Sequence, residues 1–296
     1  MKRNTTLAWV EATLAVLMWG ASFIATKVAL RDVLPVTVVW LRFALGVVVL
    51  GAAVIARRQF AWPTRKEAGY FALLGFVGIT FHQWLQSTGL VTAQASTTAW
   101  IVATTPVCIA LLGWLALKEK LGWGSVLGIA LASAGVLLVV TKGDGHTLTA
   151  GHFGEPGDLL ILISAPNWAI FTVLSRPGLH RHPATRMIFY VMTTGWLFSS
   201  VPFFAGAGLT DVARLTLPGW LGIGFLGIFC SGLAYIFWYD ALQAMPASQL
   251  GVFLYLEPLV AVVVAAVILG EAIVWASLLG GGIILLGVWL VNRYSS

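Results

Sequence analysis

Glu257 is the clearest ionisable side chain inside an apolar segment of this sequence, near the middle of the run 248–269. If that run crosses a bilayer, a carboxylate there is costly and is a functional candidate by default. Gln249, Phe253 and Glu257 recur every four residues and therefore share one helical face. We expect Glu257 to contact a substrate amine or to carry a proton. The competing interpretation is a structural carboxylate that is hydrogen-bonded to a neighbouring helix.

His82 lies halfway through another largely apolar stretch, and Gln86 follows one turn later on the same face. Histidine changes its charge near neutral pH, so His82 is the second candidate for proton exchange. It could equally serve as a core histidine that only forms a hydrogen bond. Gln83 is offset by about 100 degrees around the helix and need not share that face.

Tryptophan is abundant, with 14 residues, and five of them lie near segment ends where interfacial tryptophans are expected: Trp9, Trp62, Trp123, Trp220 and Trp275. Other rings lie deeper, beside polar side chains. An apolar cavity lined by aromatic rings and a few hydrogen-bonding groups suits an amphipathic organic molecule better than an inorganic ion. For each ring the alternative is ordinary packing or lipid contact. The further residues of this candidate cavity are Trp19, Ser22, Trp100, Asn167, Trp168, Tyr235 and Trp238.

The elements that carry these residues are apolar helices. Of 296 residues, 59% are hydrophobic and 9% are charged, whereas soluble domains carry roughly 25% charged residues. About 20 apolar residues cross a bilayer as a helix. We therefore predict an all-α integral membrane protein with ten transmembrane helices, at Leu7–Leu30, Pro35–Ala56, Gly69–Leu90, Ser96–Leu117, Leu121–Thr141, Asp158–Ser175, Thr185–Gly206, Pro218–Leu242, Ser248–Leu269 and Ala272–Val291.

The distribution of lysine and arginine predicts the orientation, because cytoplasmic loops carry an excess of both. With the N-terminus in the cytoplasm, twelve of these residues fall inside and only Arg31, Lys142 and Arg214 fall outside. An even number of spans returns the C-terminus to the same side. We expect both termini in the cytoplasm.

The chain also repeats itself. At a shift of 152 residues, 14 of the 50 positions from Leu90 to Val139 are identical, including Pro106 with Pro258 and Glu119 with Glu271. We expect a first five-helix repeat over 1–142, a periplasmic linker loop over 143–157 and a second five-helix repeat over 158–296. Because each half has an odd number of spans, the second must be inserted upside down. Such inverted-topology repeats are typical of secondary transporters, with the substrate site near the midplane between the halves.

Further positions have a predicted structural role. Pro106 and Pro258 each remove a backbone donor within a helix, so both are expected to act as hinges. Arg42 is expected to pair with an acidic residue or with helix carbonyls, and Glu271 to cap the helix that follows it. The spacings Gly124-x-x-x-Gly128 and Ser277-x-x-x-Gly281 permit close helix packing, within the chain or with a second copy.

The sequence resembles the drug/metabolite transporter superfamily, EamA type. The resemblance rests on 19–23 (WGASF), Arg42-Phe43, Thr105-Pro106 before Lys118-Glu119-Lys120, Glu257-Pro258 and Leu269-Gly270-Glu271, in that order along nearly the whole chain. Within the family the chain is most similar to bacterial inner-membrane exporters of amino acids, including the YddG-type exporters of aromatic amino acids. The resemblance implies a transporter in the bacterial inner membrane.

These observations together predict an exporter of small amphipathic metabolites, amino acids above all, that works by alternating access. Its partners would be that small molecule and the lipid bilayer; no nucleic acid, metal or cofactor is expected, and a homo-oligomer is left open. One alternative is a nucleotide-sugar or organic-phosphate antiporter, which needs more cations in the cavity than Lys27 and Arg42. A lipid-modifying intramembrane enzyme would leave the repeat unexplained, and a channel would need a continuous polar pore.

Overall fold

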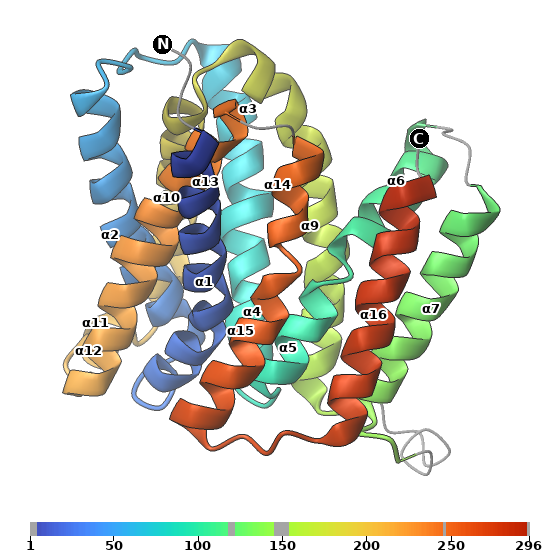
Figure 1. Ribbon diagram of the computed structural model, residues 1–296. Coiled ribbons are helices and arrows are strands. Elements are labelled where there is room, and N and C mark those ends of the chain that lie inside the picture. The colour runs from blue at the N-terminus through green and yellow to red at the C-terminus, as the bar shows by residue number, and fades with distance from the viewer. Residues whose placement is uncertain (1–4, 118–121, 145–153, 245–246, 295–296) are drawn as a thin grey trace.

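The computed structural model describes residues 5–117, 122–144, 154–244 and 247–294, and throughout these ranges the regular structure is helical. Figure 1 shows the helices as one elongated bundle. In chain order they are α1 (Thr5–Ala29), α2 (Pro35–Ala56), α3 (Arg65–Gly75), η1 (Phe76–Phe81), α4 (His82–Gly89), α5 (Ala95–Val102), α6 (Thr105–Leu117), α7 (Trp123–Val140), α9 (Pro156–Arg181), α10 (Ala184–Ala205), α11 (Gly208–Val212), α12 (Leu217–Gly224), η2 (Phe225–Leu233), α13 (Ala234–Ala244), α14 (Ala247–Phe253), α15 (Leu256–Val264), η3 (Ala265–Leu269) and α16 (Trp275–Tyr294).

Within the described residues, nine helical segments are long and apolar enough to cross a membrane. They correspond to nine of the ten expected spans. The remaining one, expected over Gly69–Leu90, is an unbroken helical segment made of α3, η1 and α4. It is not among the nine, because polar side chains such as His82, Gln83 and Gln86 interrupt its apolar run.

Three of the long segments contain a wide π-helical stretch, namely η1, η2 and η3. In η1 the side chain of Asn167 donates to the carbonyl of Val77 at 2.9 Å, and Thr80 donates across to the carbonyl of Gly195 at 2.8 Å. In a π-helix the regular backbone pattern is shifted, so side chains from other helices can reach its carbonyl groups. The second stretch, η2, occupies the corresponding place between α12 and α13 in the other half of the chain.

Helices α7 and α16 form a closely packed pair at the right of Figure 1. A methyl group placed on Gly128 would lie 2.6 Å from the carbonyl oxygen of Gly287, and one on Gly135 would lie 2.6 Å from that of Gly280. Glycine is therefore required at this crossing. Of the two predicted spacings, the first contributes Gly128 to the crossing, whereas Gly281 of the second lies against the Trp100 ring of α5. In this structure the partner of each helix is a helix of the same chain.

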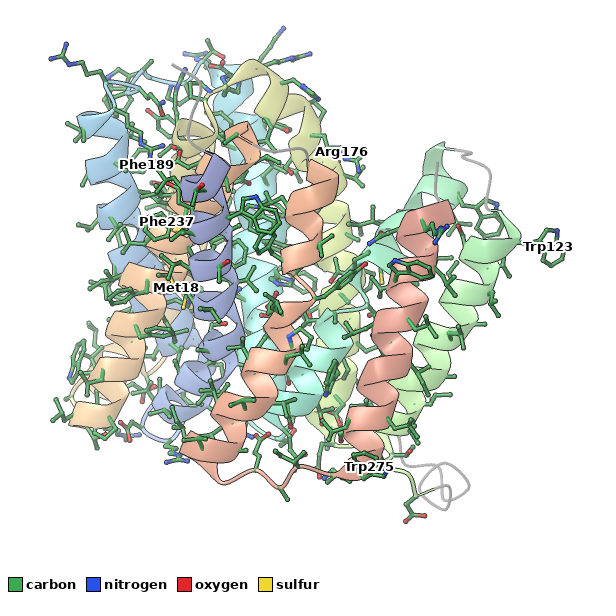
Figure 2. The ribbon with its side chains drawn as sticks, in the orientation of Figure 1. Met18, Trp123, Arg176, Phe189, Phe237 and Trp275 are labelled. Atoms are coloured by element: carbon green, nitrogen blue, oxygen red, sulfur yellow. The ribbon has the colours of Figure 1, made fainter. Side chains whose placement is uncertain are left out.

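The outer surface of the bundle is apolar, as a lipid-facing surface must be. Exposed apolar side chains include Val48 of α2, Leu127 of α7 and Val201 of α10. Trp123 and Trp275 project outward at opposite ends of the bundle (Figure 2), and both are more than three-quarters exposed. Exposed tryptophans at the two ends agree with the predicted interfacial positions.

The two ends of the bundle differ in charge. In Figure 1, α1 begins and α16 ends at the upper end, where α2 also runs out toward Arg57 and where α9 gives way to α10. This upper end carries most of the lysines and arginines of the described loops, whereas Arg31, Lys142 and Arg214 lie at the lower end. The structure therefore separates the two groups that the sequence assigned to opposite sides.

Candidate functional site

Glu257 lies where a long helical segment is interrupted. Helix α14 ends at Phe253, two residues form a turn, and α15 begins at Leu256. Pro258 has no amide hydrogen for the carbonyl of Leu254, and that carbonyl instead accepts from the amide of Glu257 at 3.2 Å. Glu257 thus occupies the first turn after a break in the middle of the segment.

The first half of the chain has the same interruption. Helix α5 ends at Val102 and α6 begins at Thr105, directly before Pro106. The hydroxyl of Thr105 donates to the carbonyl of Val102 at 2.7 Å, and that of Thr104 donates to the carbonyl of Ile101 at 2.6 Å. The Thr105 hydroxyl satisfies the Val102 carbonyl that the proline leaves free, and the Ile101 carbonyl also accepts from the Thr104 amide. Both predicted hinge prolines therefore follow a real break in the helix.

The carboxylate of Glu257 has no hydrogen-bond or ion-pair partner among the described residues. Its backbone packs on α1, where a methyl group on Gly20 would lie 2.7 Å from the Glu257 carbonyl oxygen. Its charge is close enough to act on Cys230 and Tyr235. The structural alternative, a carboxylate bonded to a neighbouring helix, has no support in this part of the chain.

Trp19 forms the centre of an aromatic cluster beside Glu257. Its ring centroid lies 5.5 Å from that of Tyr235 and 5.3 Å from that of Trp238. Its indole nitrogen donates to the carbonyl of Cys230 at 3.1 Å, which fixes the ring against η2. Trp19 thus contacts two other predicted site residues.

A second cluster joins the two halves of the chain through His82 and Trp168. Their ring centroids lie 4.7 Å apart, and Trp168 also packs 4.8 Å from Phe171. His82 is buried and hydrogen-bonds to the backbone of Ser164, while its Nδ1 atom has no partner in the described structure. Asn167 is held by η1, so these side chains form one interface between α4, η1 and α9.

Arg42 is the site residue that the sequence analysis did not select. It is only 6% exposed, and it donates to Gln83 at 2.9 Å and to Ser231 at 3.2 Å. The predicted acidic partner is not present among the described residues. Gln83 contacts Arg42, although its position around the helix had not placed it with His82 and Gln86. The presence of polar residues at positions 83 and 231 within apolar segments is the sequence signal that could have indicated these contacts.

Other predicted residues lie apart from these clusters. Trp100 is 1% exposed and fills the space beside Gly281 of α16. Phe253 packs at 5.1 Å from Trp9 near one end of the bundle. Ser22 donates to the carbonyl of Trp19 within its own helix at 2.6 Å. Gln86 is buried in α4 one turn from His82, whereas the side chain of Gln249 lies outside the described residues.

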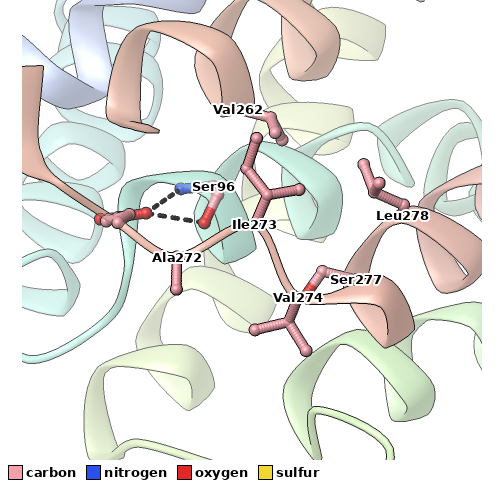
Figure 3. A pocket seen from close by; sticks show the side chains of 8 residues that line it. Ser96, Val262, Ala272, Ile273, Val274, Ser277 and Leu278 are labelled. Carbon is pink, nitrogen blue, oxygen red and sulfur yellow. Dashed lines mark hydrogen bonds between the residues drawn. The ribbon is translucent and has the colours of Figure 1, made fainter. Parts of the chain in front are cut away.

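Glu271 acts differently from the prediction. It does not cap the helix that follows it; it accepts hydrogen bonds from the Ala95 and Ser96 amides at 2.8 and 3.1 Å and from the Ser96 hydroxyl at 2.7 Å, and so caps α5 (Figure 3). The loop before α16 brings it there, beside a cavity of about 10 Å³, the lower limit for one water molecule. Lys27 lies 3.9 Å away and donates to the carbonyl of Ala93 at 2.6 Å. Glu119, its repeat mate, lies outside the described residues.

A second ion pair lies toward the opposite end of the helix bundle. Arg57, directly after α2, forms a paired contact with both carboxylate oxygens of Asp240 at 2.8 and 2.6 Å, and it also donates to Thr185 at 3.0 Å. Two parallel hydrogen bonds make such a pair strong and directional. This contact ties α2, α10 and α13 together at that end.

Groups of three or more histidine, cysteine or acidic side chains that could hold a metal ion do not occur within the described residues. At the centre, two unpaired charges, several amide and hydroxyl groups and aromatic faces are available for reversible binding of a small molecule. Long apolar helices in two similar halves, with charged and aromatic side chains at their middle, define a multi-pass membrane transporter.

The comparisons with known proteins identify the family: the chain belongs to the EamA-like transporter family, whose model matches twice, over residues 7–141 and 155–293. An "uncharacterized transporter" of Archaeoglobus fulgidus is 29% identical over 94% of this chain and 95% of its own. A "probable terminal-alkyne amino-acid exporter" of Streptantibioticus cattleyicolor is 27% identical over 95% and 91%. A protein solved by crystallography shares the fold, with a TM-score of 0.64, 20% identity and 97% and 98% coverage.

Proposed function

We propose that this protein exports small amphipathic metabolites, amino acids with aromatic or bulky apolar side chains in the first place, across the bacterial inner membrane. The observation that carries the proposal is the meeting of aromatic side chains from both halves in mid-helix positions. His82 packs on Trp168, and Trp19 packs on Tyr235 and Trp238. A substrate between the two clusters would find apolar faces together with a few polar groups.

The relative of Streptantibioticus cattleyicolor supports the amino-acid part of the proposal, because its name assigns it an amino acid as cargo. The alternative antiporter of organic phosphates is less well supported. Such a substrate carries two or more negative charges, and Arg42 is the only cation buried among the central residues described here. The other members of the family found by similarity are named as transporters, in agreement with a binding rather than a covalent role.

The proposed mechanism is alternating access by an inverted repeat of two five-helix halves. Its support is a similar order of the main elements in both halves, each with a π-helical stretch (η1 or η2) and a break before a proline (Pro106 or Pro258), although α11 and η3 are described in the second half alone. Trp123 and Trp275, equivalent in the sequence repeat, lie at opposite ends of the bundle in Figure 2, as inversion requires. Two breaks at equivalent positions would let each half bend around a central substrate.

The proposed topology places ten spans in the membrane, with both termini in the cytoplasm. The third span would be the segment of α3, η1 and α4, whose polar side chains face the bundle. If transport is coupled to protons, His82 and Glu257 are the proposed carriers, because both are titratable and both lie at membrane depth.

The experiment that tests the proposed function is counterflow in proteoliposomes. Vesicles are loaded with an unlabelled amino acid, and uptake of the labelled amino acid is followed without a pH gradient and then with one. We expect saturable exchange that is strongest for aromatic and bulky apolar amino acids. Absence of exchange for the whole panel under both conditions, by protein that remains folded, would contradict the proposal.

A further inference from the structure

Arg42 is a buried cation, and no carboxylate group contacts it among the described residues. A guanidinium has five donor hydrogens, and the contacts of Arg42 within the described structure are two neutral oxygens, those of Gln83 and Ser231, and the face of Phe43 at 5.1 Å from the ring centre. A charge held in an apolar interior without an opposite charge is strongly unfavourable. The neutral partners orient the guanidinium but leave its charge uncompensated.

Glu257 is the complementary case. It lies in the first turn of α15, and no cation or hydrogen-bond donor reaches its carboxylate in the described part of the chain. The cations of the described ion pairs lie elsewhere, toward the two ends of the bundle: Lys27 beside Glu271, Arg57 beside Asp240 and Arg214 beside Asp211, while the His182 ring lies 3.5 Å from Glu67. The centre of the molecule thus holds one unpaired charge of each sign.

The two charges lie close to the same Trp19 cluster. Arg42 donates to Ser231, whose neighbour Cys230 accepts from the indole of Trp19. The residue after Trp19 is Gly20, and its close approach to the Glu257 carbonyl places Glu257 next to this part of α1. Tyr235, in ring contact with Trp19, lies within electrostatic range of both charges. Both charges therefore border one aromatic surface.

We propose that Arg42 and Glu257 are the two poles of the substrate site: Arg42 binds a carboxylate and Glu257 binds an ammonium group. The ligand is a zwitterion whose apolar part packs on Trp19 and Tyr235. The inference rests on the proposed function and adds that the site selects zwitterions over molecules with one charge. A substrate that lacks the carboxylate or the ammonium group would leave Arg42 or Glu257 buried without an opposite charge. Planar, paired binding of a carboxylate is the contact for which arginine is best suited.

The experiment compares three molecules that share one side chain. They are phenylalanine, phenethylamine, which lacks the carboxylate, and 3-phenylpropionate, which lacks the ammonium group. In proteoliposomes with the wild-type protein, both analogues are expected to compete with labelled phenylalanine about ten- to a hundredfold less well than phenylalanine itself, the effect of one unpaired charge.

Two variants assign the poles. Arg42→Gln is expected to abolish the preference for phenylalanine over phenethylamine and to keep the preference over 3-phenylpropionate; Glu257→Gln is expected to do the reverse. Arg31→Gln, at an exposed position between α1 and α2, is the matched control and is expected to keep both preferences. If either central variant keeps the preference that it should lose, the assignment of that pole is wrong.

The wild-type competition remains decisive where a variant does not fold. Equal competition by the three molecules would overturn the inference while phenylalanine exchange itself upholds the proposed function. Failure of folded wild-type protein to exchange any zwitterion would overturn both. Arg42→Lys and Glu257→Asp keep the charges, and they are expected to keep the order of preference with weaker binding.

Discussion

At the scale of single residues, most polar and aromatic side chains at the centre of the molecule are held in place by neighbouring groups, and the carboxylate of Glu257 is the exception. Asn167 engages a carbonyl of η1, and Gln83 and Ser231 orient Arg42. The aromatic rings are held in the same way, since His82 lies against Trp168 and Trp19 is bonded to the backbone of η2. A site built in this way is preorganised, so single substitutions should alter binding more than folding.

Trp168→Ala is the prediction that follows for substrate selection. Loss of one aromatic face is worth about 0.5–1.5 kcal/mol beyond its buried area, so the KM for aromatic amino acids should rise about three- to tenfold. The KM for small amino acids should change less. Counterflow of labelled phenylalanine and alanine measures both. Trp62→Ala, at an exposed position, is the control; an equal change for both substrates would assign Trp168 to packing.

The Arg57–Asp240 pair allows a prediction for stability. Asp240→Asn removes the charge from a partly exposed paired contact and leaves Arg57 without its carboxylate. The expected cost is about 1 kcal/mol, seen as a lower melting temperature of the purified protein. The effect should diminish with added salt in the wild type, because screening weakens the pair. A melting temperature that is unchanged in the variant at low salt would contradict the role assigned to this contact.

At the scale of elements, the two interrupted helical segments are the features that transport would use. Each break is satisfied locally, by threonine hydroxyls before Pro106 and by the Glu257 amide before Pro258. Because the backbone groups are already paired at the break, bending there loses few hydrogen bonds. Alternating access needs such compliant points near the centre of the molecule.

Pro106→Ala and Pro258→Ala test this prediction. Each substitution restores a backbone donor and favours a continuous helix. We expect slower exchange at saturating substrate with little change in KM, and a higher melting temperature. Pro202→Ala, which alters an exposed proline inside α10, is the matched control: it should also raise the melting temperature, but it should leave the maximal exchange rate and the KM unchanged. Unchanged maximal exchange in both central variants would mean that the breaks do not limit the conformational change.

Glu271 connects elements that lie far apart in the sequence. Glu271→Gln loses charge-assisted hydrogen bonds to the start of α5 and the nearby Lys27, at an expected cost of about 1–3 kcal/mol. A lower melting temperature of the purified variant would confirm the contact. The variant Glu155→Gln, at the exposed start of α9, provides a comparison at another helix end.

At the scale of the whole molecule, the α7–α16 pair stands beside the rest of the bundle and depends on backbone contact. Gly135→Leu would place a side chain where a carbonyl oxygen lies 2.6 Å from the first added carbon. We expect loss of most folded protein, measured as the monodisperse fraction after extraction. Gly282→Leu, on the same pair but with open space around it, should be tolerated. Equal yields would exclude a packing role for Gly135.

The orientation is also a property of the whole chain. Cysteines are introduced one at a time at Arg65 and at Trp275, which lie at opposite ends of the bundle. A membrane-impermeant maleimide added to intact cells should label the cysteine at position 275 from the periplasm, and the cysteine at position 65 should react only when the cytoplasmic side is accessible. Cys108 and Cys230 are free thiols that could also react with the maleimide, so both are replaced by alanine beforehand. Labelling of both positions from the same side would contradict the topology.

The sequence by itself determined that the chain is a membrane protein, that its halves resemble each other and that prolines occur at matching points in both. These properties depend on composition, local periodicity and self-similarity along the chain, which need no knowledge of contacts between helices. They also made His82 and Trp19 candidates for the interior of the bundle, because mid-segment polar and aromatic residues tend to face it.

Only the tertiary structure decided which residues meet. Arg42 contacts Gln83 and Ser231 instead of an acid, Glu271 caps α5 instead of its own next helix, and Trp100 packs on Gly281. Each of these contacts joins segments far apart in sequence. A helical pattern defines which residues share a face, but the rotation and partners of that face are set by packing among all the helices at once.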